Sequence, residues 1–218
     1  MKKILLKIPV LNTMFSKLYF YIKNIKGHYR LKRAVKHSPL KIVVGASGKF
    51  EPGWVPTDVH YLNLVNLKDW KRYFDENSID AILSEHVWEH MTIEDGLIAA
   101  KHCFQYLKPV CGYLRVAVPD GYHSSPEYIE SVKVNGSGDG SDDHKVLYNY
   151  KTFGGIFEQA GFKVKLLEYF DENGEFHFSK WDVNKGMIRR SMRFDRRNQD
   201  GVLNYTSLII EATKVDNK

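Results

Sequence analysis

The most informative part of the sequence is Lys41-Ile-Val-Val-Gly-Ala-Ser-Gly48, followed by Trp54-Val-Pro-Thr-Asp58. Residues 41–44 are mostly β-branched and stand between a proline and a glycine, which predicts a short buried strand. The two glycines would let the following turn come close to a ligand, because a Cβ would obstruct that approach. Asp58 ends the second run, where an acidic residue can accept hydrogen bonds from ribose hydroxyls. A plain turn between two strands is the alternative.

Composition and charge fit one globular domain with a basic N-terminal arm. Of the 218 residues 43% are hydrophobic and 27% charged, which argues against wholesale disorder. Residues 1–50 hold twelve of the 32 lysines and arginines and none of the 26 acidic residues. The basic pI therefore reflects the arm, and nucleic acid is not the expected partner. Cys103 and Cys111 form no CxxC pair, and with no secretory signal the expected location is the cytoplasm.

The arm, residues 1–38, carries apolar residues at helical spacing from Val10 to Lys26, which predicts a basic amphipathic helix. Our first interpretation is that this helix packs on its own domain and covers a substrate cleft. Peripheral contact with an anionic membrane through residues 1–26, or contact with a partner protein, is the alternative. The sequence has no run of about 20 apolar residues, the length that spans a bilayer.

The rest of the chain, residues 39–218, alternates strands and helices and is predicted to form one domain. Besides the first two strands, we predict strands at 60–64, 79–84, 113–118, 162–169 and 205–212, and helices at 68–74, 93–107 and 150–160. Residues 120–147 are predicted to be a long loop, and 171–203 a polar insertion between the last two strands. This order predicts a doubly wound, mostly parallel seven-stranded sheet with helices on both faces. The last two strands, with no helix between them, are expected to form an antiparallel hairpin at the sheet edge.

Five stretches resemble the class I S-adenosylmethionine-dependent methyltransferases. They are Val43-Val-Gly-Ala-Ser-Gly48, Asp58, Asn63-Leu64, Ser78-Ile-Asp-Ala-Ile-Leu-Ser-Glu-His-Val-Trp-Glu-His90 and Leu107-Lys-Pro-Val-Cys-Gly-Tyr-Leu-Arg115. The fourth is the most specific, since it is similar to the family's strand-four segment ending in Val-Leu-Glu-His. The likeness fits best a subgroup with a short link between strands one and two and a Gly-Trp pair, here Gly53-Trp54.

The resemblance implies a Rossmann-like methyltransferase fold that binds S-adenosylmethionine. The turn after the first strand would pass beneath the methionine part, Asp58 would hold the ribose, and residues 63–64 would face the adenine. The residues that the resemblance assigns to the cofactor are Gly45, Ala46, Ser47, Gly48, Asp58, Val59, Asn63, Leu64, Glu85 and His86.

Methyl transfer requires chiefly that the acceptor be held in line with the methyl group. For a hydroxyl acceptor, His86 is the first candidate base, because its unperturbed pKa lies near neutrality. The further catalytic candidates are Glu85, Asp120 and His123, and the candidate substrate contacts are His144, Tyr148, His177, Arg189 and Arg190. Arginines could hold an anionic acceptor such as a nucleotide-linked sugar. The alternative is that His86 and Glu85 only shape the pocket or bind the methionine amine, and that the others are solvated loop residues.

His86-Val-Trp-Glu-His90 also matches the inverted zinc-protease motif H-x-x-E-H. That motif needs both histidines on one helix face, whereas here the residues before His86 predict a buried strand. Asp142, Asp143 and His144 form a second group with ligand-type side chains, but their spacing has no diagnostic value. The sequence therefore assigns no metal ligands.

The predicted function is an S-adenosylmethionine-dependent methyltransferase acting on a small-molecule or glycan-precursor acceptor, by O-methylation. One alternative is a catalytically silent binding or scaffold protein with the same fold. It is motivated by departures from the family pattern: Val43 in place of an acidic residue, and Val110-Cys111 in place of a glycine. An RNA methyltransferase is a third hypothesis. The strand-four segment lacks the Asn/Asp-Pro-Pro-Tyr/Phe motif typical of base-nitrogen chemistry, which counts against it.

Overall fold

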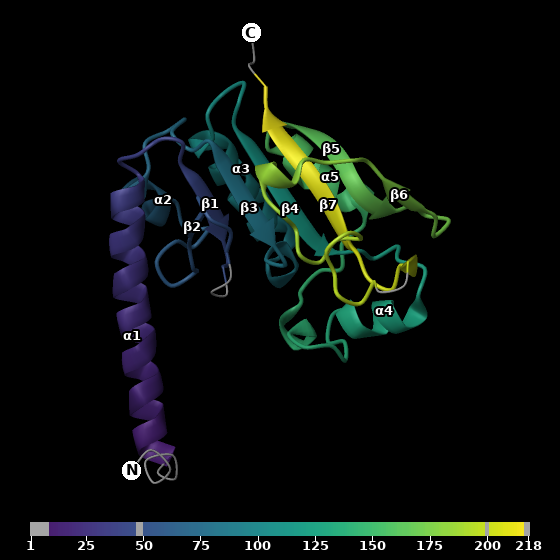
Figure 1. The fold of residues 1–218 in the computed structure, drawn as a ribbon, viewed down its shortest axis with the longest axis horizontal. Helices are drawn as coiled ribbons and strands as arrows, with labels where there is room; N and C mark the ends of the chain where they lie inside the picture. The colour runs from purple at the N-terminus through teal and green to yellow at the C-terminus, as the bar shows by residue number, and fades with distance from the viewer. Residues whose placement is uncertain (1–8, 47–49, 199–200, 216–218) are drawn as a thin grey trace.

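A seven-stranded sheet forms the centre of the protein, in the strand order β2-β1-β3-β4-β7-β5-β6 (Figure 1). The computed structural model describes residues 9–46, 50–198 and 201–215. The strands are β1 (Lys41–Val44), β2 (Val55–Pro56), β3 (Ala81–Glu85), β4 (Tyr113–Pro119), β5 (Phe162–Phe170), β6 (Phe176–Phe178) and β7 (Ser207–Lys214). Neighbours from β2 to β4 are parallel, and β7 is antiparallel to both β4 and β5. The Rossmann-like, mostly parallel sheet with an antiparallel C-terminal pair is thus confirmed.

The helices are α1 (Pro9–Ala34), α2 (Leu67–Tyr73), α3 (Ile93–Tyr106), α4 (Pro126–Val132) and α5 (Tyr150–Gln159). Helices α2 to α5 each begin after a residue whose side chain caps the first turn. Asn66, Thr92 and Asn149 each accept a hydrogen bond from a backbone N–H in the first turn of α2, α3 and α5. Short 3-10 turns lie at Trp88–His90 (η2), Ser141–Asp143 (η3) and Val183–Lys185 (η4).

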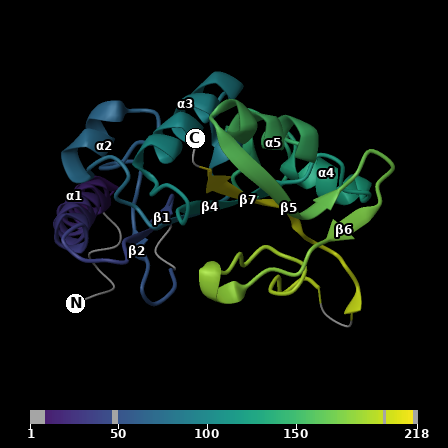
Figure 2. The ribbon, with the colours of Figure 1, turned by 90° about the horizontal axis from the view of Figure 1, so that it is seen from above.

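The two faces of the sheet are covered by different kinds of structure (Figure 2). On one face, alternate strand residues such as Ile42 and Val116 pack in the main core with α2, α3 and α5. On the other face, Leu83 and its neighbours pack against Trp181 and Ile188 from the irregular segment before β7. The prediction of helices on both faces is therefore wrong. The link from β1 to β2 is too short to hold a helix, and the polar insertion covers that face instead.

One predicted strand is absent, and the sheet has seven strands because it contains β6, which was not predicted. Residues 60–64 form turns rather than a strand, with the Asp58 carbonyl accepting hydrogen bonds from Tyr61 and Leu62 N–H. The seventh strand is β6, which lies inside the predicted polar insertion and forms the sheet edge. The antiparallel pair β5 and β7 is therefore not at the edge. β7 is buried on both faces along Leu208–Ile210, which suits an interior strand.

The predicted loop 120–147 contains the short helix α4. Ser125 accepts a hydrogen bond from Tyr128 N–H, and Pro126 occupies the first turn, where its missing N–H costs nothing. These are local start signals that the Gly- and Ser-rich composition of the region concealed.

Candidate functional site at the carboxyl ends of the strands

Three neighbouring cavities open where β1, β2 and β3 end, and Gly45 lines all of them. The Asp58 cavity, about 750 Å³, is lined by Asp58, Val59, Asn63, Leu64 and His86 among others. The Arg197 cavity, about 480 Å³, is lined by His86, His90, His144, Arg190 and Arg197 among others. The Glu51 cavity, about 310 Å³, is lined by Ala46, Glu51, Glu85, Arg189 and Arg190 among others.

Gly45 makes the turn after β1 that brings these cavities together. Its φ of +63° lies in the left-handed region, and a Cβ at this position would collide with the Val87 side chain. The Ala46 N–H donates to the Thr57 carbonyl at 3.0 Å, which ties the turn to the end of β2. Ser47 and Gly48, the other residues assigned to this turn from the sequence, lie outside the described residues.

Asp58 lies directly after β2, at the wall of its cavity. Its carboxylate is 3.3 Å from the Lys23 ammonium of α1, and it accepts a hydrogen bond from the His60 N–H at 3.3 Å. Packing of the arm on its own domain is the first interpretation of the sequence, but the sequence gives no sign that Lys23 is the residue that reaches Asp58. Nearby, Asn63 uses its side-chain oxygen to accept the Val65 N–H at 3.0 Å. A carboxylate and an amide thus stand on the same cavity wall.

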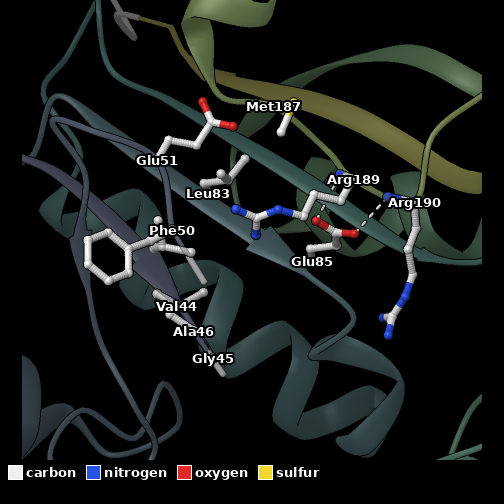
Figure 3. A pocket seen from close by; sticks show the side chains of 11 residues that line it. Val44, Gly45, Ala46, Phe50, Glu51, Leu83, Glu85, Met187, Arg189 and Arg190 are labelled. Atoms are coloured by element: carbon white, nitrogen blue, oxygen red, sulfur yellow. Dashed lines mark hydrogen bonds between the residues drawn. The ribbon is translucent and has the colours of Figure 1, made fainter. Parts of the chain in front are cut away.

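Glu85, the last residue of β3, fixes the insertion to the sheet. Its two carboxylate oxygens accept the backbone N–H groups of Arg189 at 3.1 Å and Arg190 at 2.8 Å (Figure 3). These two bonds hold both arginines at the cavity rim. Glu85 acts here as a positioning residue for the arginines, a role that its position after a buried strand did not reveal.

His86 stands between the Asp58 and Arg197 cavities and lines both. Its φ of +56° is unusual for a residue other than glycine. One ring nitrogen, Nε2, lies 2.9 Å from Ser207 Oγ, and the other, Nδ1, lies 3.0 Å from Glu89 Oε1. The two contacts fix the plane of the ring at the boundary between the cavities.

Glu89 is fully buried, and its carboxylate is held in the charged form. Burial alone would raise its pKa, but the nearby His86 ring, the backbone of Glu89 itself and His90 together lower that pKa below the usual value. Glu89 and His90 were not assigned a role from the sequence. The signal in the sequence that points to them is the H-x-x-E-H pattern of residues 86–90.

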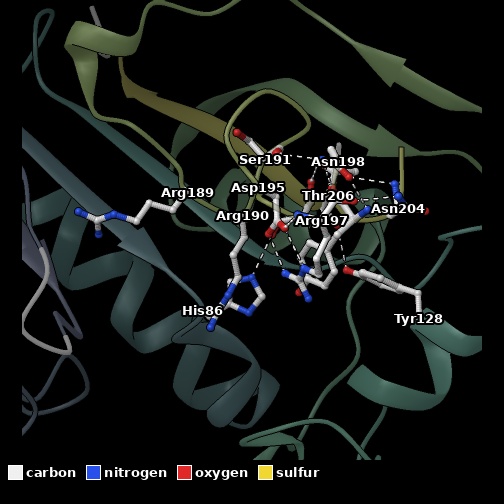
Figure 4. A network of polar contacts seen from close by, with 12 residues as sticks. His86, Tyr128, Arg189, Arg190, Ser191, Asp195, Arg197, Asn198, Asn204 and Thr206 are labelled. Carbon is white, nitrogen blue, oxygen red and sulfur yellow. Dashed lines mark hydrogen bonds and ion pairs between the residues drawn. The ribbon is translucent and has the colours of Figure 1, made fainter. Parts of the chain in front are cut away.

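Hydrogen bonds within the insertion build the wall of the Arg197 cavity (Figure 4). The Asn198 amide donates to the carbonyls of Met192 at 2.9 Å and Tyr205 at 2.6 Å. Arg197 forms two hydrogen bonds with the Asp195 carboxylate, at 2.8 and 2.7 Å. Arg190 and Arg197 both line this cavity, and so do residues 138–141.

Four residues suggested from the sequence line none of these three cavities: Asp120, His123, Tyr148 and His177. Asp120 accepts the Phe170 and Tyr122 N–H groups, and burial raises its pKa to about 6. Tyr148 is fully buried, and burial raises the pKa of its phenol. His177 stacks on Tyr169 and hydrogen-bonds to the Asp171 carboxylate at 2.9 Å.

His123 is predicted to make stability fall in mild acid. The ring stacks on Tyr128, its Nδ1 accepts the Ser125 N–H, and burial lowers its pKa to about 4. Because the unfolded chain takes up the proton near pH 6.5 and the folded protein does not, stability is lost as the pH falls from 6.5 toward 4. Relative to His123→Phe, the wild type should lose about 2 kcal/mol of unfolding free energy between pH 7.5 and pH 5.

Urea unfolding at the two pH values measures this difference. Asp120 titrates in the same range with the opposite sign, since its raised pKa makes stability fall as the pH rises from about 3.8 to about 6. Both proteins retain Asp120, so their difference isolates the histidine. Equal pH dependence in the two proteins would contradict the prediction.

No protein-family model matches the sequence, and no curated protein matches it. Several solved structures resemble the chain at low identity. An S-adenosylmethionine-dependent methyltransferase from Archaeoglobus fulgidus is 16% identical, over 90% of this chain and 100% of its own, with a TM-score of 0.43. One from Mesorhizobium loti is 12% identical over 80% and 90%, with a TM-score of 0.43. Phosphoethanolamine N-methyltransferase 2 of Haemonchus contortus, in complex with S-adenosylmethionine, is 14% identical over 88% and 53%, with a TM-score of 0.42.

These likenesses are low in both identity and TM-score. What the chain does must therefore follow from the geometry of its own site.

Proposed function

We propose that the protein is an S-adenosylmethionine-dependent methyltransferase that O-methylates a small-molecule or glycan-precursor acceptor. The observation that carries the proposal is the Asp58 cavity, where a left-handed glycine turn and the carboxylate of Asp58 meet at one end of the sheet. In open α/β sheets, ligands bind outside the carboxyl ends of strands at the point where the strand order reverses. That point is β1, since β2 lies on one side of it and β3 on the other.

The residues around the Asp58 cavity suit the parts of the cofactor. Gly45 would lie beneath the methionine part, Asp58 would accept hydrogen bonds from the ribose hydroxyls, and Asn63 with Leu64 would face the adenine. The Lys23 ammonium lies 3.3 Å from the Asp58 carboxylate. The ribose hydroxyls would therefore share this carboxylate with Lys23 or displace the lysine from it. His86, on the boundary with the next cavity, is where the sulfonium methyl would point.

The Arg197 cavity supports an anionic acceptor. Arg190 lines it as well as the Glu51 cavity, and Arg189 and Arg190 are both held at the rim by Glu85. Guanidinium groups bind carboxylates and phosphates through paired hydrogen bonds. If the arginines bind a carboxylate or phosphate of the acceptor, a hydroxyl on the same molecule would be oriented toward His86. His86 lines both the Arg197 cavity and the Asp58 cavity.

The sulfonium supplies an electrophilic methyl group when the cofactor is bound, so the protein's own task is mainly positioning. Glu85 would position the arginines, and the arginines would position the acceptor. We assign the role of base for the acceptor hydroxyl to His86 or a neighbour on the same wall. His86 would first have to exchange its contact with Ser207 for the acceptor.

Asp58→Ala tests the proposal directly. We expect calorimetric titration of the wild type to show binding of S-adenosylmethionine and S-adenosylhomocysteine, and the variant to bind roughly 10- to 100-fold more weakly. The reason is the loss of the acceptor for the ribose hydroxyls. Asp75→Ala, at an exposed position outside the cavities, is the control and should bind normally. A folded wild type that binds neither ligand would refute the proposal and favour the scaffold alternative.

The arm is proposed to have two roles. Its second half packs on the domain, with Leu31 buried in the core and Gly27 against Tyr61, and Lys23 closes one side of the Asp58 cavity. Its exposed apolar residues, including Leu18, Ile22 and Ile25, would lie on an anionic membrane surface beside the basic side chains. Among the described residues, no helix is long and apolar enough to cross a membrane.

A further inference from the structure

A cluster of three side chains in the wall of the Arg197 cavity has the composition of a transition-metal site. Glu89 and His90 come from the turn η2, and His144 directly follows η3. The ligand atoms that the three residues offer lie within 4.8 Å of one another. All three residues line the cavity, which gives an ion a path from solvent. Only the tertiary fold brings them together, because fifty residues, 91–140, separate the two turns.

The carboxylate of Glu89 is the strongest indication of a ligand. The residue is 0% exposed, and its oxygen Oε2 has no hydrogen-bond partner among the described residues. His86 Nδ1 lies 3.0 Å from Oε1, so the imidazole is the partner of that oxygen. Burying a carboxylate is costly unless it is paired or coordinates a metal, and the His86 contact leaves Oε2 without a partner. A cation bound at Oε2 would supply that partner.

The two histidines are arranged as metal ligands usually are. His144 donates its Nδ1–H to the Val132 carbonyl at 2.7 Å, so its Nε2 keeps the lone pair that a metal ion binds. The ring of His90 meets the ring of His144 edge-on, with centroids 5.0 Å apart. His90 Nδ1 also lies 3.3 Å from the Asp143 carboxylate, which places a second acidic group beside the cluster.

We propose that Glu89, His90 and His144 bind one divalent transition-metal ion, with zinc as the best match. Two imidazoles and one carboxylate form a known ligand set of catalytic zinc sites, in which a fourth position stays open. Mg²⁺ and Ca²⁺ prefer oxygen ligands and fit two imidazoles poorly. Metal binding stands independently of the proposed methyl transfer. The fourth coordination position of the metal would hold an oxygen of the acceptor. This role, unlike metal binding itself, rests on the proposed methyl transfer.

A second cluster, Asp171, Glu175 and His177, supplies the control. Asp171 already accepts the Asn173 and Glu175 N–H groups and pairs with His177, so its carboxylate is satisfied within the protein. The cluster lines none of the three cavities. His177→Ala therefore removes a surface histidine of the same kind without touching the proposed site.

The test is zinc binding by the purified full chain without S-adenosylmethionine, measured by equilibrium dialysis, with Co²⁺ as a spectroscopic probe. We expect one zinc ion per chain and the visible absorption of a four-coordinate Co²⁺ site. His90→Gln and His144→Ala should each weaken zinc binding by about 100-fold or more, whereas His177→Ala should leave it unchanged.

His90 is partly exposed, so His90→Gln should keep the fold even where removal of the buried His144 does not. Circular dichroism checks this for each variant. Zinc binding that survives His90→Gln, binding that is lost in His177→Ala, or a folded wild type that binds no zinc would each overturn the proposal. Because the cofactor is absent from this test, failure of the metal site and failure of cofactor binding are seen separately.

Discussion

Gly45→Ala is expected to weaken binding of S-adenosylmethionine and S-adenosylhomocysteine by about 100-fold or more. Alanine costs roughly 1–2 kcal/mol at the left-handed φ of +63°, and its Cβ would collide with Val87. The turn must then move, and Gly45 lines all three cavities, so the binding surface moves with it. Calorimetric titration with both ligands measures the effect.

Gly53→Ala is the matched control for this substitution. Gly53 lies on the same link between β1 and β2 and has a left-handed φ of +83°, but an added Cβ would meet nothing within 4 Å. The control therefore bears the same backbone cost without the collision. It should lose roughly 1–2 kcal/mol of stability and bind the cofactor normally. If Gly45→Ala binds like the control, the turn does not contact the cofactor.

Glu168→Ala is expected to lower the free energy of unfolding by about 3–5 kcal/mol. The Glu168 carboxylate is 0% exposed and accepts hydrogen bonds from Trp181 Nε1 at 2.9 Å, Met192 N–H at 2.8 Å and Thr206 Oγ at 2.6 Å. Alanine would leave three donors without their acceptor. Because these donors belong to the segment that covers the second face, we expect that segment to loosen from the sheet.

Thermal unfolding should show the loss as a decrease in Tm of roughly 10 °C. Glu130→Ala is the control: Glu130 pairs with Lys133 at 2.7 Å on the exposed surface of α4, where such pairs contribute little. Its Tm should match that of the wild type. Limited proteolysis would show earlier cleavage within residues 180–206 for Glu168→Ala alone. A Tm unchanged by Glu168→Ala would mean that the carboxylate does not hold this segment.

Regular local patterns were sufficient to predict most of the sheet. β1 occupies the predicted residues 41–44, because a β-branched run between a proline and a glycine has few other conformations. The helix predicted at 93–107 is also present, from Ile93 to Tyr106, and the structure shows Thr92 as its cap. The residues assigned to the cofactor lie near one another for a topological reason: Gly45, Asp58 and His86 each follow a parallel strand of the same sheet.

Where the local signal was short or ambiguous, the prediction failed. Residues 60–64 alternate like a strand, but the N–H groups of Tyr61 and Leu62 bond to the Asp58 carbonyl in a turn, and the edge strand β2 contacts α1 instead. β6 has only three residues within a polar stretch, and it exists because it pairs with β5. Cross-strand hydrogen bonds of this kind depend on the partner strand, which is not encoded in the local pattern.

The amino-acid sequence was enough to predict strands β1, β3, β4, β5 and β7, the glycine turn after β1 and the acidic residue after β2, because these depend on neighbouring residues. The tertiary structure alone decided that Lys23 meets Asp58, that Trp181 and Ile188 cover the second face, and that Glu89 and His90 share a cavity wall with His144. Each of these is a contact between segments far apart in the chain. Such contacts depend on how the whole core packs, and local propensity contains no information about it.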